Sequence, residues 1–200
     1  MIDVWNRCAI LASVGVLCTA VAVCAWVALR DATTEAHLPA QSAAEVMRLA
    51  GGAEGAFLPG GLIKEPFDES NLASLLVDPS DDLGVVQLRG AQLRRALEKS
   101  VAIYPSPNQG FLQLAGIEAT FSRSSPPERR IVAVTVGGEK LDDAKTYLIA
   151  MPGSLARGGL GYSRVWDRSQ IQPRATGLTL AEMLRGKKVT STKPHWTAVD

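Results

Sequence analysis

The longest uninterrupted hydrophobic segment lies near the start of the chain. Residues 8–29, CAILASVGVLCTAVAVCAWVAL, carry no charge and are bounded by Arg7 and by Arg30-Asp31. About 20 apolar residues suffice for a helix to cross a bilayer, so residues 1–30 are predicted to hold an N-terminal transmembrane helix. The alternative is a cleaved signal peptide, because Val23-Cys24-Ala25 offers small residues to a peptidase. Signal-peptide cores are usually shorter, which favours the anchor.

The segment after this run changes to polar residues. Residues 31–41, DATTEAHLPAQ, are interpreted as a linker in which His37 is solvated. A helix is expected to follow, because Ser42 can cap it and Glu45 can return the hydrogen bond to the cap. Gly51-Gly52 would end that helix.

The clearest helical period is in residues 90–104, GAQLRRALEKSVAIY, where Leu93, Leu97, Val101 and Tyr104 would share a buried face. Strand-like patterns occur in LGVVQLRG, GFLQLAGIEATFSR, IVAVTVGGEKL and KTYLIAM. No regular βαβ rhythm is present, so antiparallel connections are expected. The pattern predicts an α+β fold, a single layered domain over residues 42–200.

Composition excludes several classes of function. The net charge is +1 without a basic stripe, so no nucleic-acid partner is expected. All three cysteines lie in the apolar run, which excludes a disulfide framework or a zinc thiolate site in the rest of the chain. His195 is the only histidine beyond the linker and is expected to be packed or solvated beside Trp196. We therefore predict no catalytic residue, no metal site and no cofactor.

The glycine-rich stretch LARGGLGY, residues 155–162, allows three interpretations: a phosphate loop, a tight turn, or a device that positions one aromatic ring. A phosphate loop needs a strand before it and a helix after it. The following YSRVWDRSQIQP is a poor helix. Residue patterns alone therefore favour a turn.

Several motifs in order resemble the C-terminal domain of the 5′-nucleotidase / UDP-sugar hydrolase family. The matching pieces are VVQLRGAQLRRALEKSV, GFLQLAG, VTVGGEKLDD and LARGGLGY. The resemblance covers about residue 43 onward and implies the fold of that domain. It also implies that the base of a nucleoside is clamped between two aromatic rings, which match Phe111 and Tyr162.

Three departures from the family pattern accompany the two retained rings. Gly55 stands where the family supplies an arginine to the substrate, Pro79–Asp82 replaces a P-F-G-N motif, and Leu160 replaces the aspartate of G-G-D-G-Y. Asp81 and Asp82 would repel a phosphate if they faced the cleft. The D-x-H, G-D and N-H-E motifs of the family's metallophosphatase domain do not occur in the chain.

The resulting hypothesis is a membrane-tethered, extracytoplasmic and non-catalytic module that binds a nucleoside or nucleotide weakly, with a dissociation constant of about 0.1–1 mM. Nucleosides are expected to bind at least as well as nucleotides, because nothing obvious compensates a phosphate. Two alternatives stay open. The domain could be the substrate-binding part of a split 5′-nucleotidase that acts with a separate metallophosphatase chain, or a degenerate domain kept for protein contacts.

Overall fold

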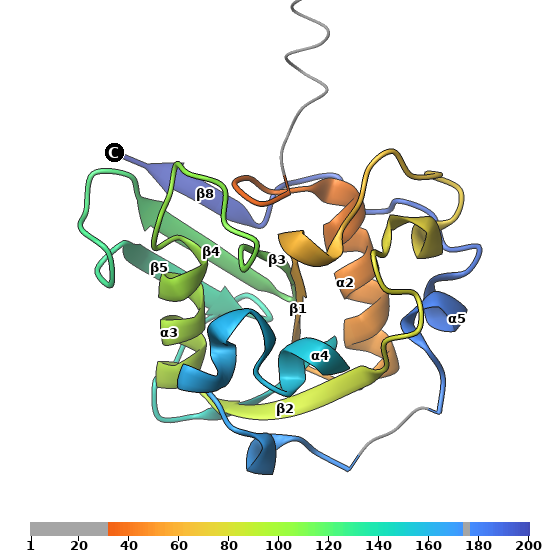
Figure 1. Cartoon of the computed structure of the whole chain (residues 1–200). Helices are drawn as coiled ribbons and strands as arrows, with labels where there is room; N and C mark the ends of the chain where they lie inside the picture. Colours follow the sequence, from red (N-terminus) through yellow and green to blue (C-terminus); the bar gives the residue numbers. More distant parts are fainter. Residues whose placement is uncertain (1–31, 174–176) are drawn as a thin grey trace, which may run out of the picture. The chain divides into compact units, whose positions relative to one another are not determined.

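Two mixed sheets frame the domain in this computed structural model, which describes residues 32–173 and 177–200 (Figure 1). The first sheet has the order β2 (Leu83–Arg89), β7 (Thr146–Pro152), β1 (Gly55–Pro59), β3 (Leu112–Ala115). The second has the order β6 (Glu139–Lys140), β5 (Ile131–Val136), β4 (Ile117–Ser122), β8 (Trp196–Val199). The α+β prediction is confirmed. The expectation of antiparallel connections is only partly met, because β1–β7 and β4–β8 are parallel pairs.

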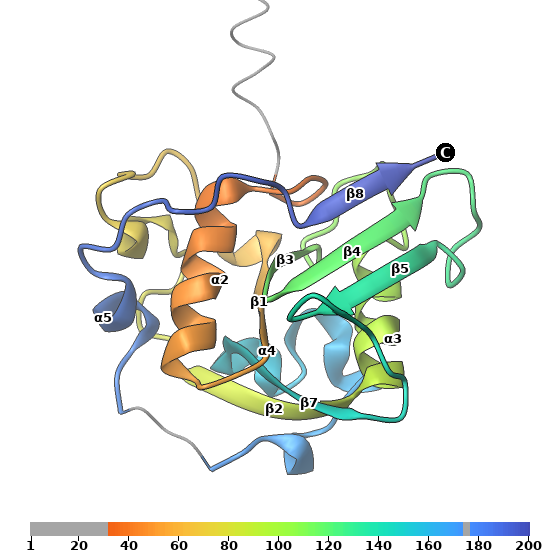
Figure 2. The same ribbon diagram turned by 180° about the vertical axis from the view of Figure 1, so that it is seen from behind.

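The first sheet is buried on both faces. Ala56 and Leu58 point into a cluster beneath helix α2 (Leu38–Ala50), whereas Phe57 between them points into a second cluster beneath helix α3 (Gly90–Ser100). The two helices lie on opposite sides of β1 (Figure 2). Burial on both faces explains why the strands of this sheet are nearly continuous runs of apolar residues.

Helix α3 presents the face that its sequence predicts. Leu93 and Leu97 are fully buried in the cluster that also receives side chains from the second sheet. The helix ends at Ser100, before the predicted end, and residues 101–105 form turns.

Gly116 divides the long strand-like stretch into β3 and β4, which belong to different sheets. Its φ is +67°, and a Cβ at this position would lie 2.4 Å from the carbonyl oxygen of Glu54. Only glycine adopts this left-handed conformation at little cost in so tight a place. The chain therefore crosses from one sheet to the other at this residue.

Helix α2 begins at Leu38, five residues earlier than predicted, and His37 rather than Ser42 is its N-cap. The ring of His37 is buried, accepts a hydrogen bond from the N–H of Ala40 and lies 2.8 Å from Glu65. Gln113 holds the preceding residues, because its amide donates to the carbonyls of Ala32 and Glu35. Residues 32–41 are thus packed against the domain, and the expected solvated His37 is not observed.

The predicted transmembrane helix lies outside the described residues. Within residues 32–173 and 177–200, no helix has the length and apolar character needed to cross a bilayer. The remaining helices α4 (Gly153–Ala156) and α5 (Leu180–Leu184) are short.

Candidate functional site

The glycine-rich stretch directs Tyr162 into the interior. After α4 the backbone turns through Gly158, Leu160 and Gly161, whose φ angles are +93°, +53° and +76°. The following 3-10 turns, Gly159–Arg164, carry Tyr162 as their buried residue. The stretch is therefore a left-handed turn that positions an aromatic ring, and the long helix that a phosphate loop requires does not follow it.

Tyr162 is fully buried, and its ring is covered by other groups of the chain. Its hydroxyl donates a 2.7 Å hydrogen bond to the carbonyl of Gly110. Burial raises the pKa of this phenol far above its ordinary value, so the hydroxyl stays protonated as a donor. The indole of Trp166 stacks on the ring at a centroid distance of 4.9 Å and an angle of 18°. The ammonium of Lys99 lies over the ring, 5.2 Å from its centroid.

Phe111 lies next to Gly110 and is also buried, with 2% of its surface exposed. Its ring contacts Trp196 at a centroid distance of 5.4 Å. Asn108 fixes the local turn: its side-chain oxygen accepts from the N–H of Gly110, and its amide donates to the carbonyls of Lys99 and Ser100. This loop is therefore fastened to the end of α3.

The structure thus brings Phe111 and Tyr162 into one core cluster, joined through Gly110. It does not place them on either side of an open cleft, because the two side chains are only 2% and 0% exposed. Sequence reasoning missed Trp166 and Trp196, the rings that pack on them. A signal was present for Trp166, which follows Tyr162 by four residues, about one helical turn.

The aspartates of the altered 79–82 stretch are held by Ser154 and by Arg157 of the glycine-rich stretch. Asp81 is buried and accepts hydrogen bonds from the N–H and hydroxyl of Ser154, and Arg157 lies 3.4 Å away. Arg157 also pairs with Asp82 at 3.0 Å. Partial burial alone raises the pKa of Asp82, but the hydrogen bond and charge of Arg157 outweigh this and leave the pKa below its usual value. Both carboxylates act here as anchors for the loop.

Gly55, which replaces the family's arginine, lies in buried strand β1. A Cβ at this position would be 2.5 Å from Cδ1 of Ile117. An arginine at this position would therefore require the side chain of Ile117 to move.

Leu160, which replaces the family's aspartate, adopts a left-handed backbone conformation with φ +53° while 40% exposed. A left-handed conformation costs a residue with a Cβ roughly 1–2 kcal/mol. We expect Leu160→Gly to raise the free energy of unfolding by about 0.5–1 kcal/mol, as measured by urea denaturation. Leu160→Ala is the control, because it removes the side chain and keeps the strained Cβ. If Leu160→Gly is no more stable than Leu160→Ala, the left-handed backbone at Leu160 is not strained.

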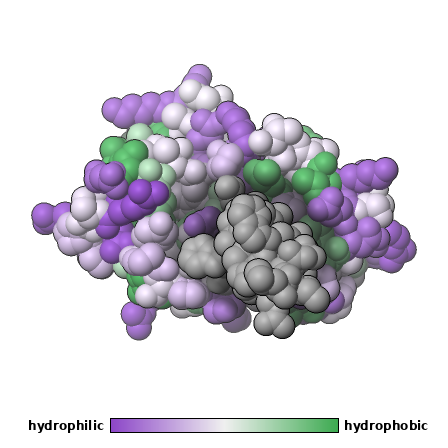
Figure 3. All heavy atoms as spheres, turned by 90° about the horizontal axis from the view of Figure 1, so that it is seen from above, coloured by the Kyte–Doolittle hydropathy of each residue, from purple (hydrophilic) through white to green (hydrophobic). Residues whose placement is uncertain are grey.

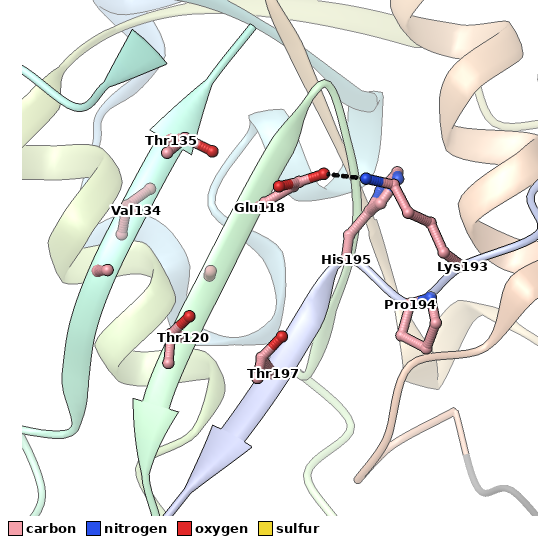
Figure 4. Close-up of a pocket in the computed structure, with 10 residues that line it drawn as sticks. Glu118, Thr120, Val134, Thr135, Lys193, Pro194, His195 and Thr197 are labelled. Carbon is pink, nitrogen blue, oxygen red and sulfur yellow. Dashed lines mark hydrogen bonds and ion pairs between the residues drawn. The ribbon is translucent and has the colours of Figure 1, made fainter. Parts of the chain in front are cut away.

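A groove of about 290 Å³ lies on the outer face of the second sheet. Thr120 and Thr197 lie opposite each other on β4 and β8, and Glu118 pairs with Lys193 at 2.7 Å at one end (Figure 4). The hydrogen bond and charge of Lys193 lower the pKa of Glu118. Nδ1 of His195 donates to the carbonyl of Leu114 at 2.7 Å, which confirms packing for this histidine. The alternating polar residues of β4 were the sequence signal for this groove.

Metal-binding geometry is absent from the described part of the chain: no three His, Cys, Asp or Glu side chains there are grouped to hold an ion. On the surface that Figure 3 leaves visible, hydrophilic residues are spread around the rim and hydrophobic ones form small separate areas. The described part of the chain thus offers two features for recognition: the groove on the second sheet and the buried aromatic cluster around Tyr162.

Comparison with known proteins places this geometry in a family. Residues 25–166, more than half the chain, match the family model described as 5′-nucleotidase, C-terminal domain. The 5′-nucleotidase of Homo sapiens is 32% identical over 126 residues, 55% of this chain and 22% of that protein. The trifunctional nucleotide phosphoesterase protein YfkN of Bacillus subtilis is 32% identical over 123 residues, 57% of this chain and 8% of that protein.

Solved structures agree on the fold. The 5′-nucleotidase precursor from Thermus thermophilus superposes with a TM-score of 0.69 at 23% identity, covering 96% of this chain and 43% of that one. The NAD nucleotidase of Haemophilus influenzae gives 0.66 at 19% identity, covering 83% and 34%. The chain spans about a fifth of the human relative. The chain belongs to the family of the 5′-nucleotidase C-terminal domain.

Proposed function

We propose that this domain is a non-catalytic module that binds the base of a nucleoside or nucleotide at Tyr162. The supporting observation is the parallel stack of Trp166 on Tyr162, at 4.9 Å and 18°. Aromatic rings stack at such separations, so this ring face accommodates a planar group of about the size of a base. A base stacked on an aromatic side chain gains about 1–3 kcal/mol.

In this proposal the base competes with the indole of Trp166 for the same ring face. The indole is also held by a hydrogen bond from its Nε1 to the carbonyl of Ala156, at 3.1 Å. Displacing it opposes binding, so the wild-type dissociation constant should lie at about 1 mM or weaker. Removing the indole should make binding tighter.

Titration of the full-length chain in detergent with adenosine tests the proposal. The chain has four tryptophans, so selective ¹⁵N labelling gives a simple spectrum of indole N–H signals, and Trp166→Ala identifies the signal of Trp166. We expect adenosine to shift that signal in the wild type and to bind Trp166→Ala at least about tenfold more tightly, with Tyr162→Ala losing about 1–3 kcal/mol of affinity.

Leu97→Ala is the matched control, because it opens space in the same core cluster without uncovering Tyr162. Adenosine affinity that is equal in Leu97→Ala and Trp166→Ala, or no shift at several millimolar ligand in any variant, would exclude a base site at Tyr162. The same samples should release no phosphate from AMP with Mn²⁺, Zn²⁺, Mg²⁺ or Co²⁺ present. Metal-dependent release of phosphate by a preparation free of contaminating phosphatase would contradict the proposal that the domain is non-catalytic.

The family supports a second candidate. Because the chain belongs to the family of the 5′-nucleotidase C-terminal domain, we propose as the alternative that it supplies substrate binding to a separately encoded metallophosphatase chain. Phosphate release that appears only when such a chain is added would favour this split enzyme. In both candidates, we propose that the uncharged run of residues 8–29 tethers the domain to the membrane on its extracytoplasmic side.

A further inference from the structure

The chain is fastened to the domain from Ala32 onward. The side-chain amide of Gln113 donates hydrogen bonds to the carbonyls of Ala32 and Glu35, at 2.9 and 2.7 Å. The N–H of Asn108 donates to the carbonyl of Thr33 at 3.0 Å. Ala32 and Thr33 are both buried. This segment therefore cannot extend away from the domain as a free linker without breaking these hydrogen bonds.

Very little chain separates this attachment from the uncharged run of residues 8–29. Only Arg30 and Asp31 lie between Leu29 and Ala32. Three residues of fully extended chain reach about 10 Å. The headgroup region on one side of a bilayer is about 5–8 Å thick. A run that crosses the hydrocarbon core would therefore keep Ala32 inside the headgroup region or just beyond it.

Two loops next to Ala32 carry no charged residue. They are residues 59–63, PGGLI, and residues 101–110, VAIYPSPNQG. A Cβ at Gly60 would lie 2.3 Å from the carbonyl oxygen of Ala32, so the first loop touches the attached segment. The hydrogen bond of Asn108 places the second loop against it. We call these two loops and residues 32–37 the tether face.

The backbone of the tether face is hydrogen-bonded within the protein. The N–H of Gly61 donates to the carbonyl of Gln109 at 2.9 Å, and the N–H of Gly60 donates to the carbonyl of Phe111 at 2.7 Å. A backbone group that already has a partner loses little when water around it is replaced by lipid headgroups. Both loops can therefore enter the interface without leaving these groups unpaired.

We propose that the tether face is a membrane-docking surface, which lies in the lipid headgroup region of the bilayer. The inference rests on the membrane tether proposed above. The short connection holds the face there, because the apolar surface of the loops is small: Ile103, at 53%, is their most exposed large apolar side chain. Stable interfacial binding without such a connection needs a much larger apolar face. The tether thus fixes which end of the domain points to the membrane.

The test uses the full-length chain, with its three cysteines replaced by alanine, in phosphatidylcholine nanodiscs that contain lipids spin-labelled at the headgroup. Ser106→Cys places an environment-sensitive fluorophore on the exposed tip of loop 101–110, and Ser169→Cys is the matched control at another exposed serine. Ser169 lies beside Gln170, which bonds to Gln92 in the first turn of α3. The loop with Ser106 follows the last turn of that helix, so the two labels lie at opposite ends of α3.

The fluorophore at position 106 should emit at shorter wavelength than the one at position 169, and the spin-labelled lipids should quench it several times more strongly. Inserting about 20 glycine and serine residues after Asp31 gives a flexible connection with a root-mean-square length of about 25 Å. This insertion should lower the quenching at position 106 to nearly that at position 169. Circular dichroism of each variant checks that the domain stays folded.

Extraction of the chain from phosphatidylcholine vesicles with alkaline carbonate tests the tether separately. If carbonate releases the chain, the tether is wrong and the docking surface with it. If the chain resists extraction but both fluorophores behave alike, the tether stands and the docking surface is wrong. If the insertion leaves position 106 fully quenched, the short connection is not what holds the face at the membrane, and the proposal is wrong on that point.

Discussion

Trp166→Ala should lower the free energy of unfolding by about 3–5 kcal/mol, the usual cost of removing a large buried aromatic side chain. Trp166 is 2% exposed, stacks on Tyr162 and donates its indole N–H to Ala156. Its loss removes the stacking, leaves a carbonyl without its partner and opens a cavity. Urea denaturation of the detergent-solubilised chain, followed by far-UV circular dichroism, measures the change.

Trp166→Phe is the control, because it keeps a ring against Tyr162 and loses mainly the hydrogen bond and part of the volume. Its cost should be less than half of that of the alanine variant. Adenosine at ten times its dissociation constant should raise the free energy of unfolding of Trp166→Ala by about 1.4 kcal/mol. A loss below about 1 kcal/mol for the alanine variant would mean that the indole is not packed on Tyr162.

Leu97→Ala should cost about 2–5 kcal/mol, the range for a fully buried leucine. Leu97 lies on the inner face of α3, where the helix packs against both sheets, so the cavity cannot easily collapse. The same denaturation experiment measures it.

Leu49→Ala provides the comparison for Leu97. Leu49 lies in helix α2 and is 64% exposed, so its replacement should change stability by no more than about 0.5 kcal/mol. Equal effects at the two positions would show that the burial assigned to α3 is incorrect.

The inner face of α3 and the left-handed glycines could be predicted from sequence because both are local. Leu93 and Leu97 are four residues apart, so the helical period alone places them on one face. Gly158 and Gly161 mark a turn because glycine tolerates positive φ. The motifs likewise indicated the family, because their order along the sequence can be recognised without knowledge of the tertiary structure.

Pairing between distant segments could not be predicted in this way. The alternation of apolar and polar residues in 110–123 is compatible with one long strand or with two strands. The close approach of Gly116 to the carbonyl of Glu54 is a tertiary contact, and at this residue the chain crosses from one sheet to the other. His37 was interpreted as a linker residue because the neighbouring residues give no sign of its contact with Gln113. The side-chain oxygen of Gln113, 76 residues away, accepts a hydrogen bond from the backbone N–H of His37.

The sequence by itself determined the family, the α+β class, the helix α3 and the turn that leads to Tyr162, because these depend on residue type and short-range spacing. The tertiary structure alone decided that Tyr162 is buried rather than open. Its hydroxyl reaches Gly110 across 52 positions of sequence, while Trp166 and Lys99 cover its ring from different elements. Local periodicity cannot report such contacts, because burial depends on which distant side chains pack on the ring.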